Sequence, residues 1–441
     1  MLQPVSHRKG WPFSVTADAE AGDESSIQPV LLVEPRDGTP EPLVTREELA
    51  AAAEGLAAGH GPVAVDAERA SGYRYGQRAY LIQLRRAGYG TVLIDPIALP
   101  DLTSIDAALA DAEWILHAAN QDLPCLAEVG MRPRRLFDSE LVGRLLGSER
   151  VSLSTMLEQH LSIRLEKGHS AADWSTRPLP KSWLVYAALD VELLIELRAV
   201  LVAELDRTGK REWAEQEFQA VLQAPPPPPR VDPWRRTSGI HGVRNRRQLA
   251  MIRALWEARD QLAARRDIAP GRVLPDAAII GAVRANPLTI DALIALPVFG
   301  GHRQQRSAPY WLEALEAGRA VPESELPPVA LMPTDPDAIP SPSRWREKDA
   351  LAAARLVACR EVVALNAEKH QVVVHNLLAG EIVRRLAWTS VTPLSVTAVR
   401  ARMAELGARP WQIDLLAAEL TEALDTTLPE PPQEPQAPAN D

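Results

Sequence analysis

The sequence predicts an α/β domain followed by two all-α helical domains. Before residue 222, short apolar strand-like segments alternate with segments of helical spacing, which is typical of a sheet flanked by helices. After residue 233, apolar residues recur at three- and four-residue spacing, as in 246–267 and 349–370, which predicts helices throughout. Five consecutive prolines at 225–229 separate the two parts, because proline lacks an amide donor and favours an extended spacer.

The elements of the first domain can be taken in chain order. Four short apolar runs predict strands, at 62–68, 80–84, 91–96 and 114–119. The alanine-rich segment 102–111 lies between the third and fourth of these runs and has the spacing of a helix. A further helix is expected to begin at Leu123, and the segment 182–201 keeps helical spacing over several turns.

The chain of 441 residues is too long for one ordinary hydrophobic core, and proline-rich stretches divide it. The second helical block resembles the first at an offset of about 101 residues, and two copies are too few for a solenoid. We expect this division: a loose N-terminus at 1–28, an α/β domain at 29–222, a proline-rich linker at 223–233, a helical domain at 234–320, a second proline-rich linker at 321–343, a second helical domain at 344–428 and a disordered tail at 429–441.

Composition excludes several classes of protein. The 58 acidic and 48 basic side chains leave a formal net charge of -10, which argues against nucleic-acid binding by bulk positive charge. Cys125 and Cys359 form no C-x-x-C pair, so we expect no disulfide-linked partner and no cysteine zinc site. The N-terminus lacks a secretory signal and no run approaches the roughly 20 apolar residues of a membrane span, so we predict a cytoplasmic monomer that does not bind membranes.

The predicted strand at 62–68 ends in two acidic residues. Asp66 and Glu68 are two positions apart, and strand side chains alternate between faces, so both carboxylates project on the same side. They also lie near a strand end, where the sites of α/β sheets gather. A strand that ends in a solvated acidic loop would show the same pattern, so the pair alone does not identify a site.

The predicted strand at 114–119 leads into a polar turn before the helix that begins at Leu123. Asp122 is a second candidate site residue, although an aspartate in this position also serves as a helix N-cap. For His117 we favour a partly buried histidine that is satisfied by the backbone over a metal ligand.

A third acid lies inside the helical segment 182–201. Tyr186 and Asp190 are four residues apart, which is about one helical turn, so they share a face and can act at one point in space. An acid in so apolar a helix needs a partner. A hydrogen bond between the tyrosine hydroxyl and the carboxylate at a domain surface would be the structural alternative.

The four acids and the tyrosine together indicate a site more strongly than any one of them does alone. Four carboxylates and a tyrosine stand at the edges of regular elements, and no Ser/His/Asp signature or Walker-type glycine loop competes with them. Hard oxygen ligands in this number suit Mg²⁺ or Mn²⁺ rather than zinc. The sequence therefore predicts a site for such ions.

The order D-x-E, then H-x-x-x-Q-D, then Y-x-x-x-D resembles the three motifs of the DEDD exonuclease superfamily, in its tyrosine-bearing branch. The flanking sequence resembles ribonuclease D over residues 40–222, and both helical blocks resemble the HRDC domains found in that family. Further matching segments are 81–84, 137–139, 152–153, 172–174, 177–179 and 186–188. In several relatives an aromatic residue follows the D-x-E acid, whereas here Arg69 follows Glu68, a departure that bears on how the terminal nucleotide is held.

The resemblance implies a ribonuclease H-like mixed sheet and a two-metal mechanism. Asp66, Glu68, Asp122 and Asp190 would bind two divalent ions, Mg²⁺ or Mn²⁺, and Tyr186 would orient the attacking water. His169 lies too far upstream of Asp190 to replace the tyrosine. The implied reaction is 3′–5′ hydrolysis of RNA with a single-stranded 3′ end, such as a tRNA precursor or another stable RNA, to 5′ mononucleotides.

Two other functions remain open at this point. HRDC modules also accompany helicases, so a 3′–5′ DNA exonuclease in repair is one alternative, and no 2′-hydroxyl contact can be identified in the sequence. The other alternative is a catalytically silent scaffold that binds nucleic acid through its HRDC modules. The intact acids argue against the scaffold.

A basic segment provides candidate RNA contacts. Residues 230–272 hold 11 arginines and 4 acids, which suits salt-sensitive binding to a nucleic-acid backbone, although arginines that cover apolar neighbours would give the same composition. Trp234 and His241 are candidates for base stacking, with packing inside the helical domain as the alternative for Trp234. The other candidate RNA contacts are Gln83, His117, Arg235, Arg236, Arg244, Arg246 and Arg247.

Overall fold

The computed structural model describes residues 28–166, 168–169, 171–329, 339–389 and 391–426. The predicted loose N-terminus, except for residue 28, and the predicted disordered tail lie outside these ranges, as do residues 330–338 of the second linker. Within the described residues, no helix combines the length and the apolar character that crossing a membrane requires.

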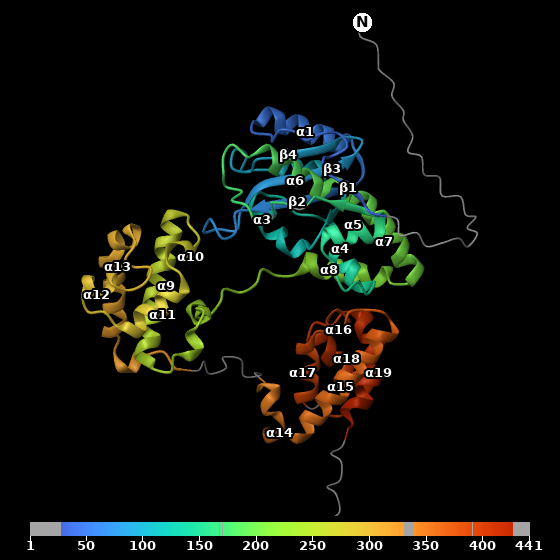
Figure 1. Cartoon of the computed structure of the whole chain (residues 1–441). Coiled ribbons are helices and arrows are strands. Elements are labelled where there is room, and N and C mark those ends of the chain that lie inside the picture. Colours follow the sequence, from blue (N-terminus) through green and yellow to red (C-terminus); the bar gives the residue numbers. More distant parts are fainter. Residues whose placement is uncertain (1–27, 167, 170, 330–338, 390, 427–441) are drawn as a thin grey trace, which may run out of the picture.

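A mixed five-stranded sheet forms the centre of the first domain (Figure 1). Its strand order is β4-β3-β2-β5-β6. The central strand is β2 (His60–Arg69), with β3 (Ala79–Ala87) antiparallel on one side and β5 (Glu113–Leu116) parallel on the other. The edge strands are β4 (Gly90–Ile94) and β6 (Arg135–Asp138). The prediction of a mixed sheet flanked by helices is confirmed, and β6 is an addition to the four predicted strands.

Helices and a small second sheet complete this domain. β1 (Val30–Leu32) pairs in parallel with β7 (Ile163–Leu165). The helices are α1 (Arg46–Ala58), α2 (Thr103–Ala108), α3 (Leu123–Glu128), α4 (Ser139–Leu145), α5 (Leu153–Leu161), α6 (Lys181–Glu192), α7 (Leu194–Thr208) and α8 (Arg211–Gln223). The predicted helix at 182–201 is therefore two helices. Its backbone leaves the helical region at Leu193 (φ -115°, ψ 5°), whose side chain stays buried in the core.

Helix α6 covers one face of the sheet and contacts β2, β3 and β4. In the β2–β3 register, Asp66 stands opposite Gln83 and Ala64 opposite Arg85, so these side chains lie on one face. Leu81, which is opposite Glu68, packs there against residues of α6. This sheet face therefore carries polar groups beneath a helix.

The opposite face of the sheet is apolar. Val65, Ile82 and Leu84 lie on it and join the main core together with Leu56 of α1 and Ile105 of α2. The alternation along β2 thus places the acids under α6 and the valines in the core, because strand side chains point to opposite faces in turn.

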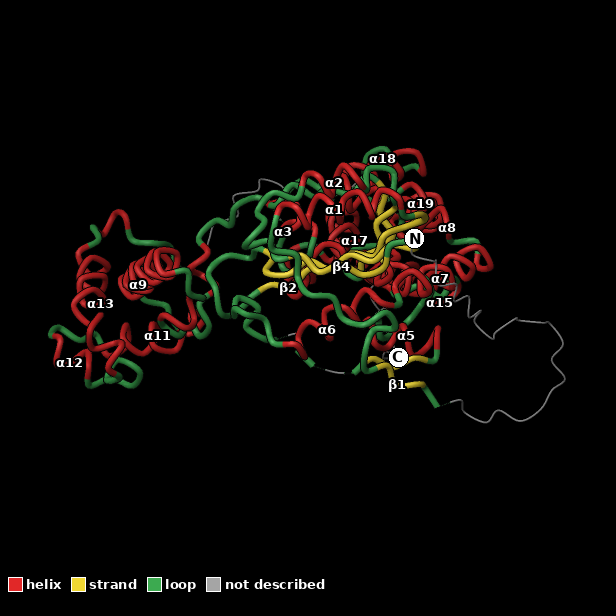
Figure 2. The backbone as a smooth tube through the Cα atoms, turned by 90° about the horizontal axis from the view of Figure 1, so that it is seen from above, coloured by secondary structure: helices red, strands yellow, loops and turns green. Residues whose placement is uncertain are grey.

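The first helical domain has a hydrophobic core of its own, which includes Trp234 and Trp311. Its helices are α9 (Arg246–Arg266), α10 (Pro270–Val273), α11 (Asp276–Ala285), α12 (Ile290–Ile294) and α13 (His302–Ala320). In Figure 2 this domain lies to one side of the sheet and is approached by the loop after β2. The loop is bound to it, since Tyr75 donates its hydroxyl to Asp260 (3.0 Å) and Arg272 donates to the backbone oxygen of Gly72 (2.6 Å).

The second helical domain repeats the beginning of the first. Its helices are α14 (Trp345–Lys348), α15 (Ala350–Lys369), α16 (Val374–Leu377), α17 (Gly380–Trp388), α18 (Val396–Glu405) and α19 (Pro410–Leu424). Helices α15, α16 and α17 begin 104 residues after α9, α10 and α11, at 350, 374 and 380 against 246, 270 and 276. The repeat predicted at about 101 residues is therefore present, with an offset three residues larger.

This second domain packs against the end of the α/β domain. Trp411 of α19 stacks on Trp213 of α8, with ring centroids 4.6 Å apart. Lys210 is buried at the same boundary and donates to the backbone oxygens of Leu145 (2.7 Å) and Gln371 (3.1 Å). Both cysteines of the chain, Cys125 and Cys359, are buried and unpaired.

Candidate active site

Three of the predicted acids meet at the end of the central strand. Asp66 and Glu68 project from β2 toward α6, and Asp190 lies near the C-terminal end of α6. One carboxylate oxygen from each of the three lies within 4.8 Å of the other two, which is close enough for all three to bind one metal ion. Residues 124 positions apart thus form one cluster, because α6 crosses the face on which the strand acids project.

The fourth acid, Asp122, lies beside this cluster and is 5% exposed. It precedes α3, but its side chain makes no capping hydrogen bond there, so the N-cap alternative does not account for it. The turn before it is held by Asp138, whose carboxylate accepts hydrogen bonds from the amides of Ala118 (3.1 Å) and Ala119 (2.8 Å). Ala118 has a left-handed backbone (φ 64°), which is uncommon for a residue with a Cβ and needs such support.

Burial dominates the electrostatics of the four acids. Desolvation raises the pKa of Asp66 to about 6, that of Asp122 to about 8 and that of Glu68 to about 10. It also raises the pKa of Asp190 well above its ordinary value. The negative charge of Asp66 further raises the pKa values of Glu68, Asp122 and Asp190. Because desolvation and like charges both penalise ionisation, the cluster holds protons near neutral pH unless a cation neutralises it.

Tyr186 stands one turn before Asp190 and is hydrogen-bonded to it. Desolvation, followed by the charges of Asp190 and Glu68, raises the pKa of Tyr186, so its hydroxyl stays protonated. The tyrosine ring packs against Trp174, with ring centroids 6.3 Å apart, and edge-on against His169, with centroids 6.0 Å apart. His169 therefore lies beside the site. Its position in the sequence, well before Tyr186, did not predict this contact.

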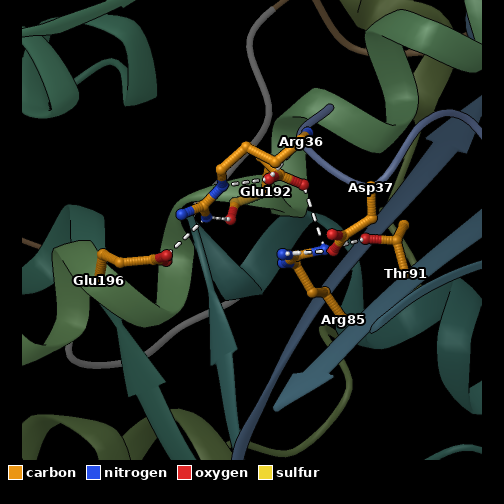
Figure 3. A network of polar contacts seen from close by, with 6 residues as sticks. All are labelled: Arg36, Asp37, Arg85, Thr91, Glu192 and Glu196. Atoms are coloured by element: carbon orange, nitrogen blue, oxygen red, sulfur yellow. Dashed lines mark hydrogen bonds and ion pairs between the residues drawn. The ribbon is translucent and has the colours of Figure 1, made fainter. Parts of the chain in front are cut away.

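Both ends of α6 are fixed to the sheet. Before the helix, Arg177 forms a bidentate pair with Asp95, with distances of 2.7 and 2.9 Å. At its end, the fully buried carboxylate of Glu192 lies between Arg36 (2.6 Å) and Arg85 of β3 (3.2 Å), as Figure 3 shows. These contacts hold the helix that carries Tyr186 and Asp190, so they set the position of both side chains relative to β2.

Replacing Glu192 should loosen this arrangement. We expect Glu192→Gln to lower the free energy of unfolding by about 2 kcal/mol, since Arg36 and Arg85 lose their buried counter-charge. Each guanidinium then keeps only a more exposed partner, Glu196 for Arg36 and Asp37 for Arg85. Glu196→Gln is the matched control, because Glu196 also pairs with Arg36 but its side chain is 40% exposed, and the change should cost under about 1 kcal/mol. Urea unfolding of the two variants measures the difference. Equal effects would show that burial of Glu192 adds nothing.

Arg69 lies at the edge of the acidic cluster. At this strand end the β2–β3 register shifts, because Glu68 stands opposite Leu81 and Arg69 opposite Ala79, which leaves Tyr80 of β3 as the extra residue. The guanidinium reaches Asp122 Oδ1 at 3.9 Å and donates a 3.4 Å hydrogen bond to Gln121. Its positive charge lowers the pKa values of Asp66, Glu68 and Asp122, in each case against the larger effect of burial.

Two of the candidate RNA contacts, Gln83 and His117, lie inside or partly inside the domain. Gln83 is fully buried opposite Asp66, and neither atom of its amide has a hydrogen-bond partner among the described residues. Its amide lies on the same sheet face as Asp66 and is closed off from solvent. His117 lies 2.9 Å from the Ser139 hydroxyl and bonds to the backbone of Val151, as the structural interpretation expected. Burial lowers the pKa of His117 to about 4.

The predicted basic contacts are largely engaged within the helical domain. Arg246 and Arg247 form the first turn of α9 and donate to backbone oxygens of residues 319–326, while Arg235 pairs with Asp232. These interactions fasten the end of α13 and the following segment to α9. Arg236 and Arg244 are exposed, as is His241. Trp234 is buried, so the packing alternative holds for it.

Sequence reasoning missed two residues that support the site. Asp138 caps α4 through the amides of Glu140 (2.9 Å) and Leu141 (3.2 Å) while it also holds the turn before Asp122. An aspartate between a strand and a helix gives a sequence signal for the capping role, but none for the second role. Glu192 gives no such signal, because its arginine partners are distant in sequence.

Comparison with protein families defines the class of this protein. Residues 41–206 match the family described as 3′-5′ exonuclease, and residues 248–315 match the HRDC domain. Residues 338–424 match a different family, described as 3′ to 5′ exonuclease C-terminal domain. The second helical domain was predicted to be HRDC-like. It begins with helices in the same order as the first, but it matches a different family. The fold and the site together define a 3′–5′ exonuclease with appended helical domains.

Relatives and solved structures identify the family. The chain is 30% identical to ribonuclease D of Gluconacetobacter diazotrophicus over 363 residues, which cover 79% of this chain and 87% of the relative. A crystal structure of a protein from Bifidobacterium adolescentis is similar with a TM-score of 0.82 and 38% identity, covering 90% of this chain and all of the other. Escherichia coli RNase D is similar with a TM-score of 0.62 and 25% identity, covering 87% and 98%. The chain belongs to the ribonuclease D family and is a 3′–5′ exoribonuclease.

Proposed function

We propose that this protein removes nucleotides from single-stranded 3′ ends of RNA with the help of two divalent metal ions. The observation that supports this most strongly is the convergence of Asp66, Glu68 and Asp190 at one end of the sheet, with Asp122 beside them. Their raised pKa values mean that the group is stable in its ionised form only with added positive charge.

The donors fit magnesium or manganese. Asp66, Glu68 and Asp190 would hold one ion, and Asp66 with Asp122 would hold the second, since Asp66 interacts with every other acid of the group. Carboxylate oxygens without nitrogen or sulfur donors suit these hard cations. When bound, such ions would lower the pKa of a water molecule and stabilise charge on the departing oxygen.

The chain's own groups would position the reactants. The hydroxyl of Tyr186 stays protonated and is fixed by Asp190, Trp174 and His169, so it can hold the attacking water by hydrogen bonding without changing its own charge. Attack on the last phosphorus breaks its bond to the 3′ oxygen of the penultimate nucleotide, which then takes up a proton. The product would be a 5′ mononucleotide and an RNA shorter by one residue.

The substrate would be an RNA whose 3′ end is free of pairing, such as a tRNA precursor or another stable RNA. The Escherichia coli relative is described as an exoribonuclease involved in structured RNA processing, which supports this class of substrate. An end in the site must approach buried acids, and a paired strand would bring the second backbone with it. We place the protein in maturation or decay of such RNAs.

Product analysis tests this function. A single-stranded RNA labelled at its 5′ end should give a ladder that shortens from the 3′ end in Mg²⁺ or Mn²⁺, and no ladder in a chelator. A DNA strand of the same sequence should be shortened much more slowly. Equal rates on RNA and DNA would favour the repair exonuclease, and products cut internally would contradict an exonuclease of either kind.

A further inference from the structure

The arginines that follow Glu68 differ in how firmly they are held. Arg74 donates to the Ser175 hydroxyl (2.7 Å) and Arg78 to the Tyr80 hydroxyl (3.2 Å), and both also pair with Asp267 of the helical domain. Arg69 has a hydrogen bond of 3.4 Å and an ion pair of 3.9 Å, both near the limit of such contacts. A guanidinium has five N–H donors, so most of the donors of Arg69 are not used by other residues that the structure describes.

The guanidinium of Arg69 reaches the edge of the site. Arg69 is the last residue of β2, where the register with β3 shifts because Tyr80 of β3 has no partner. From this strand end its long side chain reaches Asp122 Oδ1 at 3.9 Å. The side chain stays 25% exposed there, so a ligand can reach it from solvent.

The location of Arg69 indicates which part of a substrate it would meet. Tyr186 is hydrogen-bonded to Asp190, whereas Arg69 forms an ion pair with Asp122. Asp66 and Glu68 lie between them and interact with both. In phosphoryl transfer, the attacking and leaving oxygens lie roughly in line on opposite sides of phosphorus. If the water is held on the Tyr186 side, Arg69 lies on the side of the departing 3′ oxygen.

We propose that Arg69 binds a non-bridging phosphate oxygen of the RNA backbone, at or next to the scissile linkage and on the side of the departing 3′ oxygen. This inference rests on the proposed function. A planar guanidinium matches a phosphate with two parallel hydrogen bonds, and such charge-assisted bonds are stronger than neutral ones. The phosphate must approach a group of acids, so a cation at their edge also offsets the repulsion.

The test combines a protein change with a change in the RNA. Arg69→Gln should weaken kcat/KM on unmodified RNA by about tenfold to hundredfold, as expected for a hydrogen bond to a charged group. An uncharged methylphosphonate at the second linkage from the 3′ end should weaken wild-type binding but cause little further loss in Arg69→Gln. Equilibrium binding is measured in an Asp190→Asn background, in which hydrolysis should stop, with methylphosphonates at each of the last three linkages.

Two controls distinguish the outcomes. Gln121→Ala removes the hydrogen-bond partner of Arg69 and should leave RNA affinity unchanged; if it reproduces the Arg69→Gln defect, Arg69 acts by holding the turn before Asp122 and the proposal is overturned. The proposal is also overturned if the loss of affinity from a methylphosphonate at the first linkage and at the second linkage adds in full to the loss from Arg69→Gln. If Asp190→Asn still hydrolyses RNA, the proposed metal-dependent function is contradicted instead. The effect of Arg69→Gln on the response to a methylphosphonate at the second linkage is then measured from kcat/KM.

Discussion

Asp66→Asn should lower kcat/KM on single-stranded RNA by about a thousandfold, because it removes the carboxylate that is common to both proposed ion positions. A loss of about 4 kcal/mol of transition-state stabilisation corresponds to that factor. Metal ions bound at a reacting phosphate contribute several kcal/mol. The folded protein should not lose stability without metal, since one of the mutually repelling buried carboxyl groups becomes neutral. Steady-state hydrolysis and thermal melting in a chelator measure the two effects.

The matched control for this variant is Asp111→Asn, which makes the same change at an exposed aspartate of the same domain. It should leave hydrolysis unchanged. If Asp66→Asn also trims RNA at the wild-type rate in Mg²⁺ and in Mn²⁺, the acids are not catalytic and the scaffold interpretation gains support.

Tyr186→Phe should lower kcat by about a hundredfold while RNA affinity stays within about twofold. The change keeps the ring contacts with Trp174 and His169 and removes the hydroxyl that is hydrogen-bonded to Asp190. Positioned groups that assist proton movement contribute about a hundredfold or more, and the loss should fall on the chemical step because the hydroxyl acts on water. Separate determination of kcat and of the equilibrium binding constant measures both quantities.

Tyr80→Phe serves as the control, since Tyr80 is buried in the same apolar cluster and its hydroxyl accepts a hydrogen bond from Arg78. Its kcat should match that of the wild-type protein. An equal loss of turnover and of RNA affinity in Tyr186→Phe would mean that the tyrosine is structural.

Local sequence patterns were enough to predict much of the fold. Alternation along 62–68 placed Asp66 and Glu68 on one side of a strand, and the four-residue spacing placed Tyr186 and Asp190 on one side of a helix. These predictions need only strand and helix periodicity. Their convergence in space needed the resemblance to a known family as well, because periodicity does not state which face of the sheet α6 covers.

Long-range side-chain contacts could not be predicted in this way. The burial of Glu192 between Arg36 and Arg85 joins segments more than 100 residues apart, and nothing in the local sequence announces it. The ion pair of Arg69 with Asp122 is likewise a long-range contact, because it joins the end of β2 to the turn before α3. The basic composition of 230–272 did not show which arginines the domain itself uses, and arginines such as Arg247 bind backbone oxygens of their own domain.

Diffraction from crystals soaked in Mn²⁺ tests the central claim most directly, because anomalous scattering locates the ions independently of activity. The account predicts two peaks, one among Asp66, Glu68 and Asp190 and the other between Asp66 and Asp122, with the second peak lost in Asp122→Asn. Saturating Mn²⁺ that gives no peak at these carboxylates, or a single peak that contacts only one of them, would contradict the two-ion site.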